Sequence, residues 1–168
     1  MRDVNVKFKG GAYPVALDSV LLASGWQGGQ GVMWAQSPKD EFLVTRSDGR
    51  YGGFLLWGSN EDSDQHVSFV QQQLVYGHAI LCTGGWLMST RTFETHTYAS
   101  RLVPPLVPIV YTPGEGLRFS LRGFFTNEDE WTASGDPRAP NGFYLGRVVQ
   151  VPTLNEIGVS YLTIQTSL

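Results

Sequence analysis

The sequence predicts an all-β fold, a single antiparallel sandwich or jelly roll with long loops over residues 1–168. Twenty glycines and nine prolines divide the chain into short apolar runs. Almost none of these runs has the spacing of an amphipathic helix, and several alternate apolar with polar residues, as half-buried strands do. Apolar residues make up 42% of the 168 residues, which is enough for a core that needs no disulfide or metal.

The first segments of the chain alternate with a period of two. Residues 4–8 predict a strand, so the range 1–11 is either the first strand of the sheet or an extended N-terminal arm that adds to a partner's open edge. Residues 13–17 predict the next strand, which ends in a helical turn at Leu21 and Leu22. Four glycines then fall between residues 24 and 31, so this loop turns sharply or lets another backbone approach closely.

The clearest local pattern predicts a hairpin over residues 42–57. Two apolar segments flank Asp48-Gly49, a pair that supplies the positive φ angles of a type I′ turn. Residues 54–57 are apolar without a break, which predicts a strand covered on both faces. Residues 66–82 carry both helical and strand spacing, and we interpret them as strands because Gly77 would interrupt a helix.

The C-terminal half contains the most regular strand patterns. Residues 86–88 and 91–98 predict short β segments. The prolines in 103–108 exclude a central strand, since proline lacks an amide hydrogen, and predict a connection that crosses between sheets or follows an edge. Alternation then predicts strands at 117–122, 143–151 and 162–166.

Charge and cysteine content exclude several classes of function. A net charge of −3 does not suit a partner whose phosphates must be neutralised, so we expect no nucleic acid. No run approaches the roughly 18 apolar residues of a membrane span, so we expect no membrane. The first residues lack the apolar stretch of a signal peptide. Cys82 is the one cysteine and lies in an apolar run, which predicts a buried core thiol.

Residue patterns that carry catalysis or metal binding are missing. The three histidines, at 66, 78 and 96, have neither zinc-site spacing nor a nearby cysteine, and no G-x-S-x-G occurs. The acidic clusters 61–64 and 128–130 lack the spacing of a calcium loop, so we interpret them as solvated loops. We therefore expect no catalytic residue, no metal and no cofactor.

Aromatic and arginine residues are the remaining candidates for function. Five tryptophans are spread along the chain, and the cations are nine arginines against three lysines. Tryptophan and arginine dominate the energetics of protein interfaces, but tryptophans also pack cores and stack on sugar rings. From residue type and loop context, the predicted interface residues are Trp26, Trp34, Arg91, Arg101 and Trp131.

A family resemblance covers the C-terminal third. Residues 112–119 form a Pro-Gly-acid turn before a strand, 143–152 contain Gly-Arg-Val-Val, and 157–164 form a last β segment. This order resembles small structural proteins of tailed bacteriophages, chiefly capsid decoration (cement) proteins. The resemblance implies a protein without catalytic residues, made in the host cytoplasm and placed on the capsid exterior of the virion. It also implies the major capsid protein as partner, and a homo-oligomer, a trimer or dimer.

Two other functions stay open. The glycine-flanked tryptophans are compatible with a carbohydrate-binding module of a phage tail or fibre. The acidic clusters are compatible with a small β-fold hydrolase that uses Asp62, Asp64, Glu128 and Glu130.

Overall fold

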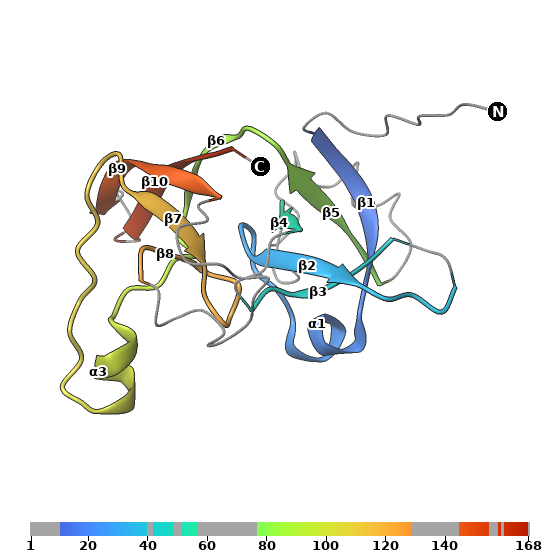
Figure 1. Cartoon of the computed structure of the whole chain (residues 1–168), viewed down its shortest axis with the longest axis horizontal. Helices are drawn as coiled ribbons and strands as arrows, with labels where there is room; N and C mark the ends of the chain where they lie inside the picture. The colour runs from blue at the N-terminus through green and yellow to red at the C-terminus, as the bar shows by residue number, and fades with distance from the viewer. Residues whose placement is uncertain are drawn as a thin grey trace.

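The structure, a computed structural model, describes residues 11–39, 42–48, 52–56, 77–128, 145–154, 158 and 160–167. In these ranges the chain forms ten strands, arranged in two sheets, and two short helices. The all-β prediction is therefore confirmed. Figure 1 shows the two sheets next to each other; the strands of the first are blue to green, and those of the second run from the green β6 to the red β10.

The first sheet closes into a barrel. Its strands are β1 (Gly11–Leu17), β2 (Gly31–Ala35), β3 (Leu43–Arg46), β4 (Gly53–Leu55) and β5 (His78–Thr83). They follow in the order β1-β3-β2-β4-β5, and β1 pairs with β5 to complete the ring. All pairs except β1–β3 are antiparallel. Closure satisfies backbone groups that an open sheet would leave unpaired at its edges.

The second sheet is open and antiparallel. Its strands are β6 (Leu87–Thr90), β7 (Gly116–Phe119), β8 (Phe125–Thr126), β9 (Gly146–Leu154) and β10 (Ser160–Thr166). They follow in the order β6-β10-β9-β7-β8. The strands predicted from the C-terminal alternation are thus confirmed. The polar residues that alternate with the apolar ones of β7 do not face solvent. Arg118 is buried within the strand, and Ser120, just after the strand, is buried and donates to Glu94.

The predicted hairpin over residues 42–57 is wrong. Strands β3 and β4 are not neighbours, because β2 lies between them and pairs with both. The pairing extends past the strand ends, where Ser47 N donates to the Gly31 carbonyl at 3.0 Å and Gly52 N donates to the Val32 carbonyl at 2.8 Å. Strand β2, from earlier in the chain, takes the hydrogen bonds that the prediction assigned to the two segments flanking Asp48-Gly49. Gly49 itself lies outside the described residues.

Two helices interrupt the strands. The predicted helical turn is confirmed as α1 (Ser19–Ser24), which begins where the Asp18 side chain accepts from Leu21 N at 3.0 Å. The second helix, α3 (Tyr98–Leu102), begins at Thr97, whose side chain accepts from Ser100 N. The strand predicted for 91–98 is wrong, since only isolated bridges at Phe93 and His96 form there. Within the ambiguous range 66–82, the described part forms β5, as predicted.

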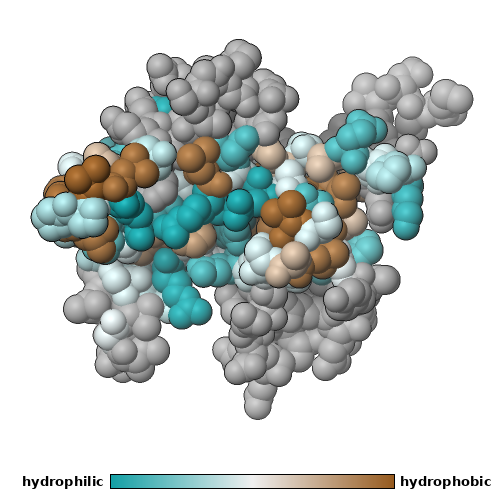
Figure 2. Space-filling model, turned by 90° about the horizontal axis from the view of Figure 1, so that it is seen from below, coloured by the Kyte–Doolittle hydropathy of each residue, from teal (hydrophilic) through white to brown (hydrophobic). Residues whose placement is uncertain are grey.

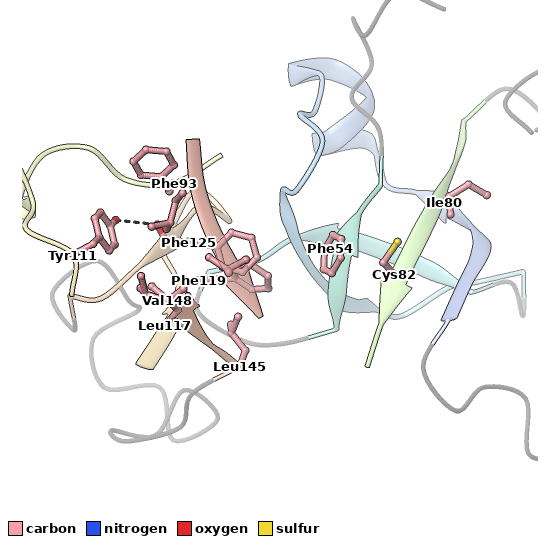
Figure 3. Close-up of a cluster of buried hydrophobic side chains, with 12 residues drawn as sticks. Phe54, Ile80, Cys82, Phe93, Tyr111, Leu117, Phe119, Phe125, Leu145 and Val148 are labelled. Carbon is pink, nitrogen blue, oxygen red and sulfur yellow. Dashed lines mark hydrogen bonds between the residues drawn. The ribbon is translucent and has the colours of Figure 1, made fainter. Parts of the chain in front are cut away.

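One hydrophobic cluster joins the two sheets. It combines Phe54, Ile80 and Cys82 of the barrel with buried residues of the second sheet, among them Phe119 and Phe125, whose ring centroids lie 4.9 Å apart (Figure 3). A second cluster fills the barrel around Leu21, Leu55 and Leu81. The shared cluster buries large aromatic side chains at the junction of the sheets, so it fixes how the barrel sits against the second sheet.

Glycines let the two sheets approach at a backbone contact. Gly31 N on β2 donates to the Gly123 carbonyl at 2.6 Å. A Cβ on Gly31 would lie 2.5 Å from the Phe119 ring. The expectation that the glycine-rich loop lets another backbone approach closely is confirmed at Gly31.

Cys82 gives a test of the hydrophobic cluster that joins the two sheets. Its side chain is fully buried on β5, as predicted, and burial raises the pKa of its thiol from 9.0 to about 12. We expect the native thiol to resist alkylation at pH 8 and to react once the protein unfolds. The unfolded thiol ionises first, so this group's stability contribution is complete below pH 9 and is lost as pH rises toward about 12. Labelling of native and urea-unfolded protein measures this difference, and rapid native labelling would contradict the burial.

Candidate functional site

A hydrophobic projection stands out from the second sheet. It consists of α3 and residues 103–110, and Figure 1 shows it extending below the strands. Every residue from 101 to 108 is exposed. The large apolar side chains of the projection, with their exposed fractions, are Leu102 (64%), Val103 (75%), Leu106 (52%), Val107 (50%) and Val110 (80%). Large apolar groups gathered in one exposed place mark interaction sites more often than single exposed ones do.

Backbone hydrogen bonds hold the projection at its base. Thr97 N donates to the Val107 carbonyl at 2.8 Å, and Ile109 N donates to the Thr95 carbonyl at 2.9 Å. The Asn127 amide donates to the Val110 carbonyl at 2.8 Å. These bonds hold the segment that leaves the projection, residues 107–110, against Thr95, Thr97 and Asn127 at its base. The apolar side chains are therefore presented by a preformed element that loses little entropy on binding.

The base also packs on aromatic side chains of the core. Tyr111 donates from its hydroxyl to the Glu94 carbonyl at 2.6 Å and to the Phe125 carbonyl at 3.5 Å. Its ring meets that of Phe93 edge-on, with centroids 5.7 Å apart. Burial, and secondarily the Glu94 charge, raises the pKa of Tyr111 above its usual value. The neutral phenol therefore anchors the chain where it returns to β7.

Other apolar side chains lie at α1, where Val20 and Leu22 are exposed at 47% and 41%. In Figure 1, α1 and α3 both lie on the lower side of the molecule. Figure 2 views that side and shows hydrophobic side chains in separate areas with hydrophilic ones between them. The projection is the larger of these two groups, because five large apolar residues contribute to it.

An ion pair between a buried carboxylate and a partly exposed guanidinium links the segment before α3 to the turn after β7. Glu94 is fully buried, and its two carboxylate oxygens accept from Nε and Nη2 of Arg122. Ser120 donates to the same carboxylate at 2.7 Å. The Arg122 guanidinium also lies 4.6 Å from the centre of the Phe124 ring. The negative charge of Glu94 is thus paired and hydrogen-bonded, which is what keeps a buried carboxylate tolerable.

A small pocket opens beside this pair, at the seam of the two sheets. Its volume is about 240 Å³. The residues that line it come from the end of α1 and the loop after it, the end of β3 and the turn after β7: Ser24, Gly25, Trp26, Gln27, Gln30, Arg46, Arg122 and Phe124. None of these side chains is acidic, and two are arginines, so the lining favours an anionic or strongly polar ligand.

The structure separates the predicted interface residues. Arg101 is exposed in the last turn of α3 and belongs to the projection. Trp26 is partly buried against the barrel core and lines the pocket. Trp34 is 47% exposed on β2 and meets the Phe42 ring at 6.1 Å between centroids. Arg91 is exposed just after β6, and Trp131 lies outside the described residues. The first four therefore occupy several parts of the surface.

Sequence reasoning missed Glu94 and the apolar residues of the projection. A sequence signal for the projection does exist, because large apolar residues alternate with prolines that cannot join a central strand. Such a segment has no sheet in which to bury its side chains. Glu94 carries no comparable signal, since its partners Ser120 and Arg122 lie 26 and 28 residues further along the chain.

The candidate catalytic and metal-binding groups have other surroundings. Glu128 accepts from the backbone N of Tyr98 at 3.0 Å, so it supports the start of α3. Asp62, Asp64, Glu130 and His66 lie outside the described residues. Among the residues that the structure does describe, no three His, Cys, Asp or Glu side chains are placed to share a metal ion. In that same part of the chain, neither helix has the length and apolarity needed to cross a membrane.

Comparisons with protein-family models, curated proteins and solved structures return no match to this chain. The projection and the pocket are therefore the features of this chain that point to a function.

Proposed function

We propose that this protein is a virion structural protein that decorates and stabilises an assembled capsid by binding the major capsid protein. The observation that carries the proposal is the projection of α3 and residues 103–110. Its apolar side chains are exposed in the isolated chain, and the hydrogen bonds at its base hold them ready for a partner. The resemblance of residues 112–164 to capsid decoration proteins supplies the kind of partner. The role needs no catalytic group and no cofactor.

The energetics of the projection suit repeated, individually modest contacts. Burying one large aliphatic side chain contributes about 1.5–3 kcal/mol before the costs of association. A few such side chains give a moderate affinity for one site. A shell offers many equivalent sites, and an oligomer that spans neighbouring subunits multiplies the affinity. We propose a dimer or trimer for this reason, which sedimentation velocity of the purified protein would measure.

The test is binding to capsids that lack the protein. We expect the native chain to co-sediment with the shells and to raise the temperature at which they break open. The double variant Val103→Asp with Leu106→Asp should bind about a hundredfold more weakly or worse, because two charges would have to be buried in an apolar contact. Co-sedimentation over a concentration series measures the change.

Leu87→Asp is the matched control. Leu87 is also apolar and 71% exposed, but it lies on β6, at the edge of the second sheet opposite to β8. The projection is attached on the β8 side, through residues 127 and 128. The control should bind like the native chain. If neither the native protein nor the control binds shells, the capsid role is rejected; if all variants bind equally, the projection is not the contact.

A further inference from the structure

We propose that the pocket between the two sheets binds a single carboxylate-bearing sugar ring, such as a terminal uronic acid of a glycan. This goes beyond the capsid role and uses a different surface, because none of the residues that line the pocket belongs to the projection. The size of the pocket, the chemistry of its lining and the rigidity of that lining all favour such a ligand.

The size limits the ligand to about one ring. Sites for drug-sized molecules have volumes of roughly 300–1,000 Å³. The pocket, at about 240 Å³, is smaller than this. It lies where the barrel meets the second sheet, and seams between packed units are common places for small-ligand sites.

The lining combines the two kinds of surface that a sugar presents. Trp26 and Phe124 place aromatic rings in the lining, and the C–H face of a pyranose packs on such rings. The Arg122 guanidinium already lies over the Phe124 ring, so Trp26 is the ring that we assign to the sugar. The exposed Gln27 side chain offers an amide that both donates and accepts, as sugar hydroxyls require, and the Ser24 hydroxyl, which donates to the Val20 carbonyl at 2.8 Å, can still accept. A purely apolar ligand would displace water from the Gln27 amide without replacing its hydrogen bonds, which costs free energy.

The charge of the pocket selects an acid over a neutral sugar. Arg122 is balanced by the buried carboxylate of Glu94, whereas Arg46, on the exposed end of β3, adds a second guanidinium to the lining. A guanidinium binds a carboxylate through two parallel hydrogen bonds, with stronger pairing than neutral groups achieve. Arg46 is therefore the residue that we assign to the ligand carboxylate.

Hydrogen bonds fix the walls before any ligand arrives. Gln30 is only 6% exposed; its amide oxygen accepts from Gln27 N at 3.0 Å and its amide nitrogen donates to the Arg122 carbonyl at 3.1 Å. Arg122 is in turn held by both oxygens of Glu94. The Gln30 side chain thus ties the barrel loop to the turn of the second sheet, and a preorganised site of this kind loses little free energy to ordering.

The experiment is calorimetric titration of the full chain with methyl glucuronide, methyl glucoside and glucose 6-phosphate. We expect binding of the glucuronide, with the neutral glucoside about tenfold or more weaker, since one charge-assisted contact is lost. Arg46→Gln should weaken glucuronide binding by a similar factor and leave the glucoside unchanged. Arg147→Gln, which removes an exposed arginine on β9 outside the pocket, is the charge-matched control and should bind like the native chain.

Each other result overturns the assignment. Absence of glucuronide binding rejects the site, and equal binding of acid and neutral sugar rejects the role of Arg46. Tighter binding of the sugar phosphate would show that the pocket selects phosphate rather than carboxylate. Equal losses of glucuronide affinity in Arg46→Gln and Arg147→Gln would show that the net charge of the protein, and not Arg46 itself, determines binding. Because Arg46 is exposed, both variants should fold, which their unfolding midpoints in urea would verify.

Discussion

Replacing Glu94 by alanine should destabilise the protein by about 3 kcal/mol, a large fraction of the stability of an ordinary domain. The variant removes the acceptor for Arg122 and for the hydroxyl of Ser120, which is itself fully buried. Breaking a fully buried pair costs about 3–5 kcal/mol. We expect the lower end, because the Arg122 side chain is 42% exposed and water partly replaces its lost partner. Urea unfolding of the two proteins measures the difference.

Matched variants separate the lost pair from a general loss of packing. Arg122→Ala should also destabilise, because it leaves the Glu94 charge buried without its cation. The double variant Glu94→Leu with Arg122→Met should lose less than either single alanine variant, since no unpaired charge remains. Glu115→Ala removes an acid that accepts from Thr112 N and the Asn127 amide near the surface, and should cost only about 1 kcal/mol. A Glu94→Ala loss no larger than the Glu115→Ala loss would contradict the importance of the buried pair.

Gly123→Ala should have the second large effect, about 2–4 kcal/mol, by forcing the two sheets apart. Gly123 has a φ of +75°, in the left-handed region that disfavours residues with a Cβ. A Cβ there would also overlap the Gly31 carbonyl oxygen, which is backbone and cannot rotate away. The cost is therefore the sum of a local strain and a displacement of β2 from the turn after β7. Equilibrium unfolding in urea gives the total.

Gly114→Ala isolates the local strain. Gly114 has a similar φ of +87°, but a Cβ on it would meet nothing within 4 Å. This control should cost about 1 kcal/mol, the penalty of the left-handed conformation alone. The difference between the two variants measures the close contact between the sheets. Equal losses of unfolding free energy in Gly123→Ala and Gly114→Ala would mean that the contact between Gly123 and Gly31 accommodates an added methyl group at no cost.

Glu94 connects the two candidate sites, the projection and the pocket. Glu94 accepts from Tyr111 through its backbone, at the base of the projection, and from Arg122 through its side chain, at the wall of the pocket. The same residue therefore supports both surfaces. Variants at Glu94 are suited to testing stability, whereas the projection and the pocket are better tested at Leu106 and Arg46, which are exposed.

The sequence by itself determined the all-β class, the positions of most C-terminal strands, the short turn of α1 and the burial of Cys82. These features follow from local patterns, namely alternation, glycine and proline placement and apolar runs, which act over a few residues. The tertiary structure alone decided that β2 separates β3 from β4, that the first sheet closes through β1 and β5, and that Glu94 meets Arg122. The physical reason is that strand pairing and ion pairing join residues far apart in the chain, and several strands with similar patterns compete for each edge. Only the packing of the whole chain selects among them.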